Sequence, residues 1–578
     1  MTGDEAPGLP TGRDVEARIG TRATALIVGI LAVLASLTPS LLPRPALLQG
    51  ALAALSFLLG YLAGVLLYRL ACRVREVVRS RMPRQGPARF NDLADGAARF
   101  ARRLLPRRRA LRIILAVTGI AIGANAVAGA AVANQNEVRA AVEMPPLDGV
   151  AYGALLLAFI VVTALGFGVA AACRSLARTL TRVAGPRRGI VLTAAAVAVV
   201  AVVVGGGVVA TVDRVYAERN AAADGVSAPT ASTRSGSPGS VVEWQTLGRH
   251  GAAFVAGGPR AADIAALTGG AALDPVRVYV GLTSAPTLDE RVALAVDELH
   301  RTGAFERDVL VVATTTGSGW LEPQTVDAIE YLHAGDTAIV AIQYAYTPSW
   351  VSFLFDPDAP IGSARALFAA VEAEVAALPA GDRPRLVSYG LSLGAHGSQA
   401  VFADLDDVRA RTDGALFVGS PNGSVMWRHL QATRDAGSPA WQPVRDAGRQ
   451  VRWISLPADL ASLAGPWEDP RVLYLQHPTD PVTWLGPQLL WQSPEWLRAE
   501  QRGPGISPAM TWFPVITGLQ VTVDMLMGES VPARYGHNYG DVVVDGWRAV
   551  TGDAGLSDAA LDSVRAEIAS YPYRDEND

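Results

Sequence analysis

The sequence predicts two parts: an α-helical transmembrane bundle, followed by an α/β domain with a mainly parallel sheet. Hydrophobic residues make up 50% of the 578-residue chain and charged residues only 18%, and the apolar excess lies in the first 212 residues. From about residue 275 the pattern changes to short apolar runs that alternate with helical stretches. Such alternation is typical of a parallel sheet that helices cover on both faces.

Five apolar stretches are long enough to cross a hydrocarbon core of about 30 Å, which takes roughly 20 helical residues. They cover about 23–42, 47–70, 111–133, 149–172 and 189–212. The first stretch could instead be a signal peptide, because Arg13, Arg18 and Arg22 precede it. The residues at 41–44 form a poor cleavage site, however, and a second span follows closely. This favours a membrane domain at 23–212 after a short N-terminal segment at 1–22.

Arginine residues predict the orientation of these spans. The loops at 73–110 and 174–188 are rich in arginine, whereas the loop at 134–148 holds Arg139 beside three acidic residues. Positively charged loops stay in the cytoplasm, so the N-terminus and both arginine-rich loops are expected there. A basic loop could also bind anionic lipids. With five spans, the rest of the chain lies outside the cytoplasm, which predicts a multi-pass protein of the cell membrane.

Composition excludes several function classes. The net charge of −4 gives no reason to expect a nucleic-acid partner. Two cysteines, Cys72 and Cys173, each at the end of an apolar stretch, cannot form a disulfide framework or a cysteine metal site. We therefore expect neither a metal nor a cofactor. The spans contain no convincing ionisable residue, which argues against a transporter.

After the membrane domain, a segment at 213–245 rich in Ser, Ala, Thr, Gly and Pro predicts a flexible linker. The domain at 246–578 contains seven expected strands, at 276–282, 308–314, 337–343, 385–389, 414–418, 451–456 and 472–476. Helical spacing of apolar residues predicts helices between them, for example at 287–301 and 363–378. Parallel sheets of this kind bind ligands at the carboxyl ends of their strands.

The motif G-L-S-L-G at 390–394 follows the strand at 385–389 and opens a helical stretch. Strand, G-x-S-x-G and helix in this order form a nucleophile elbow, in which small neighbours let the serine hydroxyl project above the sheet. The motif could also be an ordinary glycine-rich turn. The context favours Ser392 as a nucleophile and predicts an α/β-hydrolase fold.

A serine hydroxyl needs an adjacent base, and that base needs an orienting carboxylate. In this fold the chain order is Ser, then Asp or Glu, then His. Asp480 follows an apolar strand, and His537 is the only histidine after it. His396 lies on the helix of the elbow itself, and His477 ends a strand.

Order and elimination therefore predict the triad Ser392, Asp480 and His537. Asp480 could instead be a plain turn residue, with Asp459 or Asp469 as the acid, and His537 could be a hydrogen-bonding loop residue.

The oxyanion hole requires two preorganised backbone N–H groups. Leu393, after the nucleophile, is expected to supply one. The loop T-T-T-G-S-G-W at 314–320 is expected to supply the other, unless it is only a structural turn. Ser318 lacks the elbow context of a nucleophile. The predicted oxyanion and pocket residues are Leu393, Gly317 and Ser318 for the oxyanion hole, and Trp320, Tyr344 and Trp350 for the substrate pocket.

Several motifs together resemble a known family. They are T-G-S-G-W at 316–320, Q-Y-x-Y-x-P-S-W at 343–350, G-L-S-L-G at 390–394, G-S-P-N-G at 419–423 and H-P-x-D-P at 477–481. Over nearly its full length the chain resembles a bacterial α/β-hydrolase family common in actinobacteria, in which a multipass membrane region precedes the catalytic domain. The resemblance implies a serine hydrolase fold, without departure at the triad positions.

The predicted function is that of a membrane-anchored serine hydrolase, an esterase or lipase that acts on acyl esters of envelope lipids. An acyltransferase with a sugar or lipid alcohol as acceptor would use the same triad. A non-catalytic membrane receptor or scaffold on a hydrolase fold is the third hypothesis. The expected partners are a lipid or acyl-ester substrate and the membrane, and the oligomeric state stays open.

Overall fold

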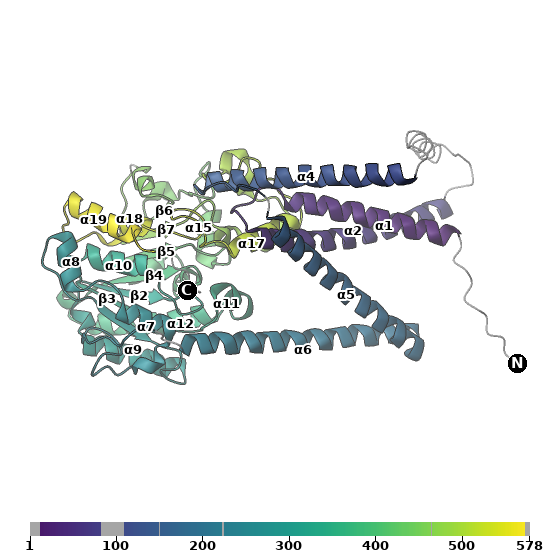
Figure 1. Ribbon diagram of the computed structural model, residues 1–578. Helices are drawn as coiled ribbons and strands as arrows, with labels where there is room; N and C mark the ends of the chain where they lie inside the picture. Colours follow the sequence, from purple (N-terminus) through teal and green to yellow (C-terminus); the bar gives the residue numbers. More distant parts are fainter. Residues whose placement is uncertain (1–11, 82–108, 150, 222–224, 464, 573–578) are drawn as a thin grey trace.

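A computed structural model describes residues 12–81, 109–149, 151–221, 225–463 and 465–572. Long helices from the first part of the chain extend to one side of an α/β domain (Figure 1). The structure confirms the predicted fold class.

A seven-stranded parallel sheet forms the centre of the α/β domain. Its order is β1-β3-β2-β4-β5-β7-β6, and every neighbouring pair is parallel. The strands are β1 Val276–Val280, β2 Val309–Thr314, β3 Thr337–Ile342, β4 Arg385–Leu391, β5 Gly414–Val418, β6 Val451–Ile454 and β7 Arg471–Leu475. All seven predicted strands are confirmed. Residues on both faces of β1, β2 and β3 are buried, which explains why these strands read as continuous apolar runs in the sequence.

Helices cover both faces of this sheet (Figure 1). One layer contains α9 Leu288–Thr302, α12 Ala359–Ala377 and α13 Leu393–Gln399, and the other contains α10 Pro323–Leu332, α18 Val542–Thr551 and α19 Asp558–Ala569. Shorter helices complete the domain: α7 Gly248–Ala256, α8 Ala261–Thr268, α11 Ser349–Phe355, α14 Leu405–Arg411, α15 Val425–Ala432, α16 Pro481–Trp484 and α17 Ile516–Met525. The helix α9, predicted at 287–301, begins with a capping box between Thr287 and Glu290, and Gly303 in a left-handed conformation follows its last residue.

In the part of the chain that the structure describes, five long helices precede the α/β domain: α1 Gly12–Ser36, α2 Ala46–Arg81, α4 Arg109–Ala141, α5 Tyr152–Ala184 and α6 Pro186–Ala221. Among the described residues, four segments are long and apolar enough to cross a membrane: Ile19–Ser36, Ala46–Val78, Tyr152–Ala184 and Pro186–Ala221. The span predicted at 111–133 falls in α4. Several side chains there lie outside the described part of the chain, so that span stays a prediction.

The five helices run alternately toward and away from the α/β domain (Figure 1). The turn at 37–45 between α1 and α2 lies against the domain, as does the end of α4, whereas the α5–α6 junction lies at the far end. This junction carries Arg182, Arg187 and Arg188. The orientation of these helices relative to a membrane stays a prediction from the arginine distribution.

The structure corrects the prediction of a flexible linker at 213–245. Its first part continues α6 to Ala221, and residues 222–224 lie outside the described chain. Further on, the backbone around Arg234 adds to the edge of β1, because Ser235 N–H donates to Arg277 O and Arg277 N–H donates to Thr233 O, both at 3.0 Å. The fully buried Arg234 guanidinium donates to the carbonyl of Val255 at 2.9 Å.

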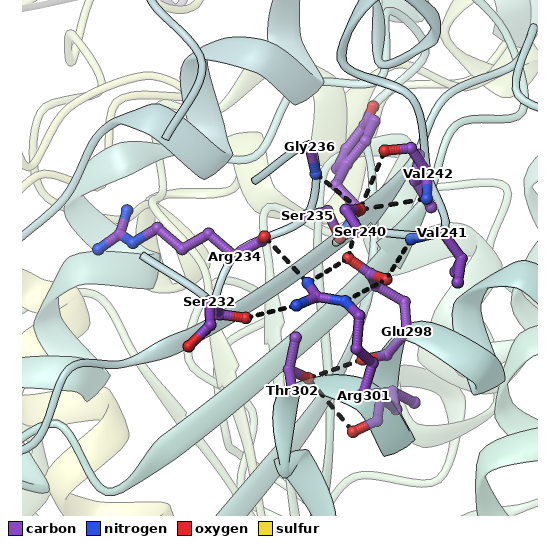
Figure 2. A network of polar contacts seen from close by, with 12 residues as sticks. Ser232, Arg234, Ser235, Gly236, Ser240, Val241, Val242, Glu298, Arg301 and Thr302 are labelled. Carbon is purple, nitrogen blue, oxygen red and sulfur yellow. Dashed lines mark hydrogen bonds and ion pairs between the residues drawn. The ribbon is translucent and has the colours of Figure 1, made fainter. Parts of the chain in front are cut away.

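Figure 2 shows a second anchor of this segment on α9. The buried Glu298 carboxylate accepts hydrogen bonds from Ser240 Oγ at 2.6 Å and from Val241 N–H at 3.1 Å. Beside it, Arg301 donates to Ser232 O at 2.8 Å. Small polar residues predicted flexibility, but their backbone groups find partners at a free sheet edge, which composition cannot reveal.

Candidate active site

Ser392 lies at the tip of the predicted elbow. It follows β4 directly, precedes α13 and has φ 56° and ψ −122°, a conformation that is strained for a residue other than glycine. A Cβ at Gly390 would lie 2.3 Å from Gly394 O, and one at Gly394 would lie 2.2 Å from Thr314 O. The turn therefore admits only glycine on both sides of the serine, and the G-x-S-x-G spacing follows from this close approach.

The predicted acid and the predicted base contact each other at the same edge of the sheet. Asp480 follows β7, and its Oδ2 lies 2.8 Å from Nδ1 of His537. The hydroxyl of Tyr539 donates to the same oxygen at 2.8 Å, and Val482 N–H donates to Oδ1 at 2.8 Å. The fully buried carboxylate is thus satisfied on both oxygens, and it fixes the imidazole so that Nε2 faces away from it.

Electrostatics in the site favour a charged pair. Burial alone would lower the pKa of His537, but the charge of Asp480 and the hydrogen bond to it raise the pKa to about 9. Burial alone would raise the pKa of Asp480, but the charge of His537 and the hydrogen bonds from His537 and Tyr539 hold it below its usual value. Asp480 thus stabilises an imidazolium, the species that forms when a histidine base accepts a proton.

Ser392 and His537 line one cavity of about 130 Å³. Among the described residues, Nε2 of His537 has no hydrogen-bond partner, and this atom can accept a proton when the imidazole is neutral, which its raised pKa places at alkaline pH. The remaining wall is largely apolar. It comes from Leu393, Pro421, Ser349 and Trp350 of α11, Val482 and Leu485, and from Met525 at the end of α17 with residues 526 and 528–530 after it.

The alternative triad residues lie elsewhere. His477 is fully buried. Its Nδ1–H donates to Gly536 O at 3.0 Å, and its ring stacks on Tyr539 with ring centroids 4.2 Å apart. Burial lowers the pKa of His477 to about 4, so it remains a neutral support for the site. Asp459 caps its own turn by accepting from Ser455 N–H, and Asp469 pairs with an arginine at the surface.

The predicted oxyanion residues are only partly brought together. Leu393 lines the cavity, as expected for the residue after the nucleophile. Gly317 N–H donates to Ser349 Oγ at 3.1 Å, so it contacts the cavity wall rather than the cavity. Ser318 lines a separate small cavity with Arg219 and Arg249 and is not among the residues that line the Ser392 cavity.

The three predicted pocket aromatics also diverge. Trp350 lines the Ser392 cavity and is 41% exposed. Trp320 is buried and lines a different groove, beside α7 and α10. Tyr344 lies outside the lining of the Ser392 cavity. Side-chain direction within these loops decides which residue faces the serine, and the sequence carries no periodic signal for it.

Sequence reasoning missed two contributions. The first is Tyr539, which contacts both the acid and the ring of His537, at a tilt of 78° and a centroid distance of 5.9 Å. The sequence signal that could have indicated Tyr539 is its position two residues after the predicted base, His537. The second is the end of α17 and the residue after it, Met525 and Leu526, which line one wall of the cavity.

A parallel sheet with an elbow serine, a buried Asp–His pair and a shared cavity defines the class of α/β-hydrolase fold proteins. Residues 276–564 match the model of an alpha/beta-hydrolase family, and residues 37–259 match the model of the N-terminus of the same family. The chain belongs to this family. No curated protein and no solved structure matches it significantly.

Proposed function

We propose that the protein is a membrane-anchored serine esterase that acts through an acyl-enzyme on Ser392. One observation carries this proposal: Ser392 and His537 line one cavity, and the carboxylate of Asp480 lies 2.8 Å from Nδ1 of the imidazole. At a pH where the imidazole of His537 is neutral, it can accept the proton of an adjacent serine hydroxyl and make that hydroxyl a competent nucleophile.

The reaction follows from these positions. Nε2 of His537 accepts the proton as Ser392 Oγ attacks the ester carbonyl, and Asp480 stabilises the resulting imidazolium. Leu393 N–H donates to the oxyanion of the tetrahedral intermediate. The C–O bond to the alcohol then breaks, and His537 returns its proton to that alcohol. Water repeats the sequence on the acyl-enzyme and releases the carboxylic acid.

The surroundings of the cavity favour a lipid ester. Trp350 and Leu526, 41% and 50% exposed, lie on its wall. Close to Trp350 in the chain, the hydroxyl of Tyr346 donates to Asp213 of α6 at 2.7 Å, and Leu526 follows α17, which packs against α1 and α2. Both walls are thus attached to membrane helices. We place this domain on the extracytoplasmic side, where it would meet lipids of the outer leaflet.

Fluorophosphonate labelling of the full-length protein tests the proposal. Such probes react with activated serines, so wild type should be labelled and Ser392→Ala should not. Ser318→Ala is the matched control, since Ser318 also lies in a glycine-rich loop but faces another cavity. Labelling that survives in Ser392→Ala, or that disappears in Ser318→Ala alone, would refute the assignment.

A further inference from the structure

The turn at 37–45 between the first two membrane helices (the hairpin turn) is buried inside the α/β domain. Leu41 and Leu42 are 0% exposed and belong to the same apolar core as the sheet. A turn that only connected two spans would lie at the membrane surface, where water could solvate its backbone. This turn instead loses all contact with solvent at both leucines.

Asp524 of α17 receives the hairpin turn. Its Oδ2 accepts hydrogen bonds from the backbone N–H groups of Leu41 at 3.0 Å and Leu42 at 3.4 Å, and its Oδ1 accepts one from Ser40 Oγ at 3.0 Å. The Arg44 guanidinium lies 3.6 Å from Oδ1, and both side chains are fully buried. A buried carboxylate is tolerated only where such partners replace water.

A short path leads from Asp524 to the catalytic histidine. The next two residues, Met525 and Leu526, line the Ser392 cavity. Gly528 then accepts the backbone N–H of His537 at 2.7 Å. Leu42 also packs directly against Gly536, the residue before His537, because a Cβ at Gly536 would lie 3.2 Å from Leu42 Cδ1.

We propose that the hairpin turn is a structural part of the active site and that Asp524 is the positioning residue that couples it to His537. The turn fixes the end of α17, and the end of α17 fixes the loop that holds the imidazole beside Asp480. The membrane helices therefore position the base, in addition to anchoring the enzyme. This inference rests on the proposed function for its catalytic consequence. A displacement of about 1 Å at a reacting group can slow a reaction on the order of 10²-fold.

The test compares three variants of the full-length protein. Asp524→Asn removes the charge that faces Arg44, and Leu42→Ala removes the contact with Gly536 while the ion pair stays intact. Glu137→Gln is the control. Glu137 of α4 also joins a long N-terminal helix to the α/β domain, because it accepts a hydrogen bond from Ser507, but it lies outside the path from Asp524 to His537. We measure the fluorophosphonate labelling rate against pH, and amide hydrogen exchange along the chain.

We expect labelling of Asp524→Asn and Leu42→Ala to slow on the order of 10²-fold. The pH midpoint of labelling should fall, because a displaced imidazole gains less from Asp480. Exchange should rise at 525–537 and nowhere else as strongly, while Glu137→Gln matches wild type.

Wild-type labelling rates in both variants, or faster exchange spread evenly over the domain, would overturn the inference. If Asp524→Asn does not fold, Leu42→Ala decides alone. The two proposals can fail separately. If exchange rises at 525–537 in the two variants but the wild-type protein is never labelled, the proposed function is refuted and the coupling between the hairpin turn and the His537 loop stands.

Discussion

Replacement of Asp480 by asparagine should change both the rate and the pH dependence of the site. The substitution keeps the shape of the side chain but removes the charge that faces Nδ1 of His537 at 2.8 Å. An amide can present its NH₂ group to the imidazole and so favour the wrong tautomer. Loss of this orientation costs on the order of 10⁴-fold in rate in a comparable triad.

The pH dependence follows from the balance at His537. Burial is the largest influence and lowers its pKa, and the charge and hydrogen bond of Asp480 reverse this and raise it to about 9. The base must be neutral, so the wild-type rate should rise with pH through about 9. Without the opposing charge, burial dominates, and the midpoint of Asp480→Asn should fall below 6.5, the ordinary value for histidine.

Fluorophosphonate labelling rates of the full-length protein, measured from acid to alkaline pH, give both quantities. Asp459→Asn is the matched control, because Asp459 is a capping residue outside the cavity. A midpoint that stays in place in Asp480→Asn, or an equal loss in Asp459→Asn, would show that Asp480 is not the acid of the triad.

Three further outcomes are expected. Tyr539→Phe should lower the free energy of unfolding by about 1.5–3 kcal/mol in chemical denaturation, because a hydrogen bond to a buried carboxylate is lost. Gly419→Ala should slow labelling on the order of 10²-fold, since its Cβ would lie 2.4 Å from Cε1 of His537, whereas Gly437→Ala, with open space around it, should not. A reporter that is active only in the cytoplasm should be silent when fused after Asp578, and a strong signal would refute the topology.

The candidate triad residues could be singled out because each of them has a sequence landmark. Ser392 lies between a strand and a helix, and the glycines at 390 and 394 on either side of it are needed because the backbone approaches them too closely for a Cβ atom. Asp480 follows a strand that is two places from β4 in the sheet, and His537 follows the acid in the chain. Parallel strands end at one edge, so residues at these ends must meet.

The remainder of the site depends on loop geometry and long-range contacts. Ser318 and Trp320 lie on the expected loop but face other cavities, because the direction of a loop side chain has no periodicity to read. The contact between Asp524 and the hairpin turn joins residues more than 480 positions apart. Its one local signal is a carboxylate within the otherwise uncharged segment at 516–526.

Trapping of the acyl-enzyme tests the central claim most directly. The full-length protein is mixed with an acyl ester, quenched in acid, digested and analysed by mass spectrometry. We predict that the peptide containing Ser392 gains the mass of the acyl group, with release of one equivalent of alcohol in the first turnover. Ser392→Ala should gain none. Ester turnover without an adduct on Ser392, or an adduct on another residue that persists in Ser392→Ala, would contradict the account.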